Sequence, residues 1–170
     1  MKTFLTCCLA ALLGFGLLAA RPAQAKQHLL LGSSIVGGSY YVLGGTYAKY
    51  INDTYPDLDV SVEVGGGPYS NITLLSNGEI DLGFATTWAT GEMYDGINDQ
   101  KKKHKDIRAF LPLFPSYLQI YSLAESPIKS MGDIQGKIAS SGAAGSSGRI
   151  ATQTLFDILG IKPAKLNSVP

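Results

Sequence analysis

The stretch that decides the fold is residues 29–41, which read LLLGSSIVGGSYY. Its apolar run ends in a Gly/Ser loop, and apolar side chains at helical spacing follow the loop, as expected for a buried strand leading into a helix. The same order returns twice. Alternating valines at 60–64 precede GGGPYSN at 65–71, and KIA at 137–139 precedes SSGAAGSSGR at 140–149. Three strand–loop–helix units indicate an α/β protein with mainly parallel sheets.

The periodicity of the remaining chain predicts further elements. We expect strands over 29–33, 60–64, 81–85, 107–113, 118–123 and 137–140. We expect helices over 39–52, from 68 or 70 to 77, and over 147–159. The proline-bounded piece at 113–117 is interpreted as a crossover between a first lobe, 26–115, and the start of a second, 116–170. Only a short stretch follows the last helix, so we expect the chain to stop partway through that second lobe.

The first 25 residues have the pattern of a cleaved export signal. Lys2 precedes an apolar run over 5–20, and a small-x-small site ends at Ala25. The alternative is a membrane anchor, for which this run is short. Both cysteines, Cys7 and Cys8, lie in this segment, so the mature chain is expected to contain no disulfide and no thiol nucleophile. The charge balance of the remainder is close to neutral, which disfavours nucleic acid as a partner.

Motifs for cofactor chemistry and catalysis are missing from this pattern. The third loop continues as Gly148-Arg149-Ile150 rather than with the Lys-Ser/Thr of a phosphate-binding loop, and its glycines lack the dinucleotide spacing. The histidines, His28 and His104, are expected to be exposed, and no cluster has metal-ligand spacing. We therefore expect no enzyme activity, no cofactor and no metal.

The three Gly/Ser loops are suited to hold a small anion. Each offers backbone N–H groups, hydroxyls and the positive end of a helix. The residues expected at the ligand are Gly37, Gly38, Ser39, Ser70, Asn71, Ser146 and Ser147. We expect a cleft between the two lobes, with these loops on its walls. Aromatic and polar side chains expected beside this cleft are Tyr40, Tyr69, Thr86, Thr87, Trp88 and Tyr117. Arg149 either pairs with a ligand carboxylate or lies on the surface with an acidic neighbour.

These motifs resemble a known family. SIVGGSYY at 34–41, followed by Leu43-Gly44-Gly45, is similar to the opening motif of the TAXI solute-binding proteins of TRAP (tripartite ATP-independent periplasmic) transporters. GPYSN at 67–71, GEIDLGF at 78–84, IKSMGDIQGK at 128–137 and GSSGR at 145–149 resemble later elements of such proteins, in the same order. The chain departs from the family pattern at Thr86-Thr87-Trp88 and at Pro68-Tyr69, which indicates an altered pocket.

The resemblance implies a two-lobed, type II-like periplasmic-binding-protein fold. It also implies a monomeric periplasmic receptor that captures a small organic anion, such as glutamate or a dicarboxylate, and delivers it to TRAP membrane subunits. Two alternatives stay open at this point. One is a binding module for an ATP-driven importer or a sensor kinase. The other, less favoured, is a secreted hydrolase.

Overall fold

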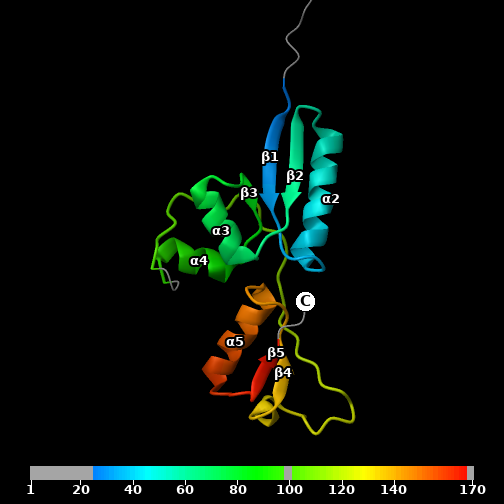
Figure 1. Cartoon of the computed structure of the whole chain (residues 1–170), viewed down its shortest axis with the longest axis vertical. Helices are drawn as coiled ribbons and strands as arrows, with labels where there is room; N and C mark the ends of the chain where they lie inside the picture. The colour runs from blue at the N-terminus through cyan, green and yellow to red at the C-terminus, as the bar shows by residue number, and fades with distance from the viewer. Residues whose placement is uncertain (1–24, 98–100, 168–170) are drawn as a thin grey trace, which may run out of the picture.

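The structure, a computed structural model, describes residues 25–97 and 101–167. Its first unit contains a parallel sheet in the order β2-β1-β3. Figure 1 shows α2 beside β2, with α3 and α4 on the other side of the sheet. The elements are β1 (Gln27–Gly32), α2 (Ser39–Thr54), β2 (Leu58–Glu63), α3 (Pro68–Asn77), β3 (Leu82–Gly83) and α4 (Thr87–Asp95).

The second unit repeats the strand–helix–strand order on a smaller scale. Its two strands pair in parallel, and the helix between them begins with a Ser/Gly loop. The elements are the 3-10 helix η1 (Met131–Ile134), β4 (Ile138–Ser140), α5 (Ser147–Leu159) and β5 (Lys165–Asn167). Both units therefore confirm the predicted α/β class with parallel sheets.

Three apolar clusters hold these elements together. Leu31, Ala48 and Val60 are buried where α2 covers the β1–β2 pair. The second cluster joins α3 to α4 through Ile72, Ala89 and Met93, and the third packs α5 against η1 through Ile134, Phe156 and Ile161. Because each unit has apolar contacts of its own, each positions its own loops at the facing ends of the sheets.

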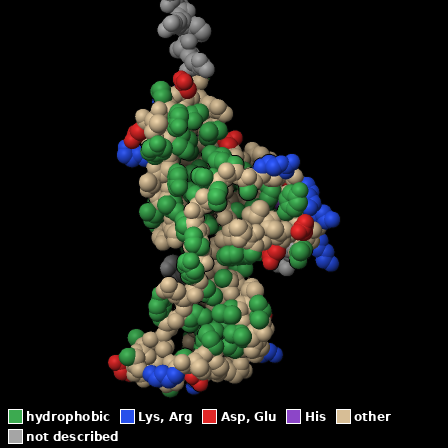
Figure 2. Space-filling view, turned by 180° about the vertical axis from the view of Figure 1, so that it is seen from behind, with side chains coloured by type: hydrophobic (Ala, Val, Ile, Leu, Met, Phe, Trp, Pro, Cys, Tyr) green, Lys and Arg blue, Asp and Glu red, His purple; other side chains and the backbone are tan. Residues whose placement is uncertain are grey.

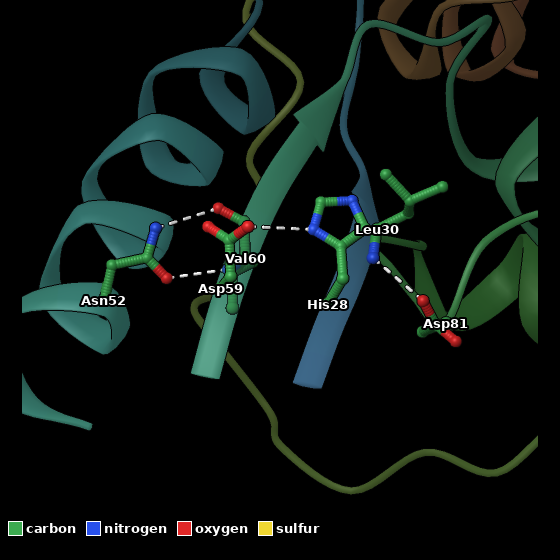
Figure 3. A network of polar contacts seen from close by, with 6 residues as sticks. All are labelled: His28, Leu30, Asn52, Asp59, Val60 and Asp81. Carbon is green, nitrogen blue, oxygen red and sulfur yellow. Dashed lines mark hydrogen bonds and ion pairs between the residues drawn. The ribbon is translucent and has the colours of Figure 1, made fainter. Parts of the chain in front are cut away.

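Side chains also fix the first sheet at the end away from the second unit. Figure 3 shows Asn52 of α2 bonding both backbone groups of Val60, with its Oδ1 at 2.7 Å from the Val60 nitrogen. His28 contacts Asp59 across the β1–β2 pair at 3.0 Å, and both side chains are about half exposed. These contacts anchor β2 in register with β1. The Gly/Ser loops lie at the opposite end of the sheet, where the strands have their carboxyl ends.

Two predicted strands are wrong. Residues 107–113 and 118–123 form no strand, and their large apolar side chains are mostly exposed, as at Phe110 and Tyr121. Alternating apolar residues predict a strand only where a partner edge is available, and the described residues provide none for this segment. The third predicted strand is also shorter than 81–85, because pairing with β1 covers only Leu82 and Gly83.

The sequence prediction missed helix α4 and misplaced one histidine. Thr86 begins α4 as its N-cap, with Oγ1 accepting a bond from the Ala89 nitrogen at 3.4 Å. His104 was expected to be exposed with the lysine run, but it is fully buried, with Nδ1 at 2.7 Å from the Ser76 hydroxyl. Its backbone N–H also donates to Met93, so this residue closes the end of α4 while Lys101 to Lys103 stay exposed.

Candidate functional site

A cavity of about 380 Å³ lies where the loops of both units meet. The first loop, the second loop, the crossover and the third loop all contribute to its wall. The lining residues are Ser34, Ile35, Val36, Gly37, Gly38, Ser39, Tyr40, Gly66, Gly67, Pro68, Phe114, Ser116, Gly142, Ala143, Ser146, Ser147 and Gly148. The sequence repeat that suggested three equivalent loops thus corresponds to one shared space.

Strand direction explains this meeting point. In Figure 1 the arrowheads of β1 and β2 point toward the second unit, and the start of α5 faces the first unit. In parallel sheets the loops at the carboxyl ends of the strands are the usual place for ligands. Helices α2, α3 and α5 begin at Ser39, Pro68 and Ser147, all of which line the cavity. Three helix N-termini therefore face one space, and their dipoles favour negative charge there.

The helices start differently on the two sides. The N-cap residues of α2 and α3 are Gly38 and Gly67, which have no side chain to cap the helix. On the opposite side Ser146 caps α5, with its Oγ accepting a bond from the Arg149 nitrogen at 3.2 Å. The Ser34 hydroxyl in the first loop accepts a bond from the Tyr41 nitrogen at 3.2 Å. The first-unit wall thus starts its helices on glycines, whereas the second-unit wall starts on a hydroxyl.

An aromatic side of the cavity is built around Tyr40. Its ring stacks on Phe84 with centroids 5.2 Å apart and lies 6.5 Å from the ring of Phe114. The Tyr40 hydroxyl donates to the carbonyl of Ala85 at 3.4 Å. Burial raises the pKa of this phenol above its ordinary value. Tyr40 and Phe114 therefore present an apolar surface next to the helix N-termini.

Charged side chains are missing from the described lining, which contains glycines, hydroxyls, small apolar groups and aromatics. Figure 2 shows, on the face it presents, that lysines and arginines gather on the flank of the first unit and at the outer end of the second. An anion in the cavity would be held by backbone N–H groups and hydroxyls alone. An ammonium group would find no carboxylate there.

Six of the predicted ligand residues line the cavity. They are Gly37, Gly38, Ser39, Tyr40, Ser146 and Ser147. Their role in binding stays a prediction. Tyr69, Ser70, Asn71, Thr86, Thr87, Trp88, Tyr117 and Arg149 do not line it.

Asn71 is the clearest correction. It is fully buried, and its Nδ2 donates to the carbonyls of Gly32, Ser33 and Phe84 at 3.2, 2.8 and 2.8 Å. Because these carbonyls end β1 and β3, Asn71 fixes the chain where the first loop leaves the sheet. It shapes the wall from behind instead of facing the space.

Arg149 makes contacts within its own unit, and its pairing with a ligand carboxylate stays a prediction. Its Nη1 donates to the Ser141 hydroxyl at 3.2 Å and to the Leu166 carbonyl at 2.9 Å. Ser141 directly follows β4, and Leu166 lies in β5. The guanidinium therefore joins the first turn of α5 to both strands of its own unit.

The remaining predicted residues lie outside the lining, most of them on or against α4, a helix that the sequence did not predict. Thr86 is buried as the cap of α4, while Thr87 and Trp88 are exposed on its first turn. The Tyr69 hydroxyl bonds the carboxylate of Glu92, also on α4. Ser70 packs beside Gly66 just behind the lining, and Tyr117 is 79% exposed.

Other cavity residues were not singled out as ligand contacts. Most lie inside the three loops that the sequence had marked, which was a usable signal. Phe114 and Ser116 lie in the crossover, where only the flanking prolines hinted at a special position. Ile35, Val36 and Ala143 carry no polar side chain, so a search for ligand-binding chemistry passes over them.

The described residues contain no group of His, Cys, Asp and Glu side chains arranged to hold a metal ion. None of their helices has the length and apolarity required to cross a bilayer.

Comparison with known proteins gives one family. No curated protein matches the chain. The family model described as the NMT1-like family matches residues 31–170. The match begins within β1 and includes every loop of the cavity and every later element. This family comprises periplasmic solute-binding proteins related to those of TRAP and TAXI type. The chain belongs to the NMT1-like family of periplasmic solute-binding proteins.

Proposed function

We propose that this protein is the periplasmic receptor of a TRAP-type transporter, of TAXI kind, and that it binds a small organic anion without catalysing a reaction. One observation carries the proposal: three helix-opening loops from two units share one cavity whose described lining has no charged side chain. Backbone N–H groups at helix starts bind carboxylates without a counter-charge, as the proposal requires. The resemblance of 34–41 to the TAXI opening motif supports the transporter partner.

The ligand is best described as a carboxylate with an apolar body. Helix starts and hydroxyls would receive the carboxylate, and Tyr40 with Phe114 would cover the apolar part. An ammonium group on the ligand would be repelled by the helix N-termini, which carry partial positive charge. We therefore expect glutarate to bind more tightly than L-glutamate, which has the same carbon skeleton and an added ammonium.

Titration calorimetry with these two probes tests the site. Native mass spectrometry of protein purified from the periplasm then identifies any ligand that stays bound. Heat from glutarate and a weaker response to L-glutamate are expected. A retained ligand without any acidic group, or saturable binding to a protein in which Ser39 and Ser147 are both changed to bulky leucine, would contradict the proposed site.

The two sides of the cavity also imply a mechanism. Neither unit alone encloses the space, so a ligand that contacts both favours the arrangement in which they approach. We expect the crossover at 115–117 to be the hinge and the closed form to be the one that membrane subunits recognise. Small-angle scattering should give a smaller radius of gyration at saturating glutarate. An unchanged scattering curve at saturation would refute closure.

Export completes the proposal. The pattern of the first 25 residues predicts that periplasmic protein begins at Lys26. N-terminal sequencing checks this directly, and retention of Met1 would contradict it.

A further inference from the structure

Two glycine loops from different units touch through their backbones beside the cavity. A Cβ atom placed on Gly67 would lie 2.9 Å from the carbonyl oxygen of Gly145. A Cβ placed on Gly145 would lie 3.1 Å from the carbonyl oxygen of Gly66. Both distances are shorter than an ordinary carbon–oxygen contact, and the groups they approach are main chain, which cannot rotate away. A Cβ at Gly67 therefore requires a shift of main chain, and a Cβ at Gly145 requires the facing loop to give by a few tenths of an ångström.

Backbone conformation separates this contact from an ordinary need for glycine. Gly67 and Gly145 have positive φ angles of 98° and 78°, which favour glycine by themselves. Gly37 has a φ angle of 86° and also lines the cavity, but a Cβ placed there meets nothing within 4 Å. The close approach is therefore an additional constraint, present at 67 and 145 and not at 37.

We propose that Gly67 and Gly145 are positioning residues that let the two walls close to main-chain contact and so set the closed width of the cavity. Gly67 is buried at the N-cap of α3, and Gly145 lies next to Ser146, the N-cap of α5. Their contact brings two of the helix starts to a defined spacing. A methyl group at either position would act as a wedge between the units. The inference rests on the proposed function for its meaning, but the spacing can be measured without any ligand.

Distances between spin labels measure that spacing in the full chain. Val64 is 51% exposed in the first unit, and Gln153 is exposed on α5. Cysteines at these positions take the labels after Cys7→Ser and Cys8→Ser remove the native thiols. Pulsed electron–electron double resonance then compares the parent protein with Gly67→Ala and Gly145→Ala. The matched control is Gly37→Ala, which introduces the same kind of backbone strain where the added methyl group meets open space.

The expected result is a short-distance population in the parent and in Gly37→Ala, present without ligand and larger at saturating glutarate, and a shift of that population to longer distances in Gly67→Ala and Gly145→Ala. The double variant should shift no further than the larger single shift, because one wedge already separates the walls. Absence of the short-distance population in the parent, an equal shift in Gly37→Ala, or additive shifts in the double variant would each overturn the inference.

A second measurement covers the case in which the alanine variants do not fold. A nitroxide on Val64→Cys, in protein that carries Cys7→Ser and Cys8→Ser and keeps both glycines, should broaden the amide signal of Gly145, which belongs to the other unit. An unbroadened Gly145 amide overturns the contact. Failure of both glutarate and L-glutamate to bind would count against the proposed function and would leave this spacing result standing.

Discussion

The two walls of the cavity have the same strand–loop–helix order but stabilise it in different ways. On the first-unit side, α2 and α3 begin at Gly38 and Gly67, and the buried amide of Asn71 holds the strand ends from behind. On the second-unit side, Ser146 caps α5 itself, and Arg149 ties the helix to both strands. The difference teaches that one wall is supported by a buried amide and by a hydroxyl of its first loop, Ser34, and the other by contacts within the first turn of its own helix.

The largest effect should come from removing the support of the first wall. Asn71→Ala leaves the Ser33 and Phe84 carbonyls without the amide donor, while the Gly32 carbonyl keeps the Phe84 N–H. It should lower the free energy of unfolding by about 3 kcal/mol, since a buried unsatisfied polar group costs about 1–3 kcal/mol. Urea denaturation measures it. The control is Asn77→Ala on the same helix, where the exposed amide bonds only Glu79 among the contacts described, and where we expect less than about 0.5 kcal/mol. Equal losses in both variants would remove Asn71 from this role.

The next effect concerns the second wall. Arg149→Ala should lower the free energy of unfolding by about 2 kcal/mol, the range for hydrogen bonds made by a charged group. Arg149→Lys should recover only part, because a lysine lacks the planar fork. Arg108→Ala, which removes an exposed arginine bonded to nearby carbonyls, is the matched control. Unchanged stability together with weaker glutarate binding would place Arg149 at the ligand and erase the contrast between the walls.

A smaller effect is expected at the cap of α5. Ser146→Ala should cost about 1 kcal/mol of stability, the usual value for loss of a serine N-cap. Its neighbour Ser147 lines the same cavity without capping the helix, so Ser147→Ala should leave thermal unfolding nearly unchanged while it affects binding. If the two variants melt alike, the second wall does not depend on its cap.

The smallest effect is a pH dependence inside the second unit. The Lys129 N–H, the Ser130 hydroxyl and the Ser130 N–H, in that order, lower the pKa of Asp133, whose carboxylate closes the capping box of η1. A lowered folded-state pKa means that the carboxylate stabilises η1 above the ordinary aspartate pKa and that this contribution is lost as pH falls through the lowered value. The amide signals of Lys129 and Ser130 should shift in that acidic range. In Asp133→Asn they should not titrate.

Local patterns in the sequence were enough to predict much of the fold. Helix α5 runs over 147–159 as predicted, α2 begins at Ser39, and Gly78 and Gly160 end their helices in the left-handed conformation. Such caps depend on residues within a few positions of each other, so periodicity and glycine placement reveal them. The strands predicted at 107–113 and 118–123 failed because pairing depends on a partner far away in the chain.

The candidate site was predictable only to the level of its loops. Glycine and serine clusters after apolar runs located the walls, because parallel strands bring their carboxyl ends to one edge. The direction in which a side chain points was not predictable. Asn71 and Ser70 are neighbours on α3, yet the first is fully buried against three carbonyls. Trp88 was misplaced because a single threonine cap began a helix where a loop was expected.

The use of helix starts to receive the anion has a consequence for how the specificity of the cavity can change in evolution. Most mutations alter side chains, and a peptide N–H at a helix start is kept whatever residue carries it, proline excepted. Selection can therefore retune this pocket at the positions that present a side chain, such as Tyr40, Phe114 and Ser116, without losing the N–H groups. Relatives that bind different solutes would then share the helix starts that receive the anion and differ in the side chains that cover the rest of the solute.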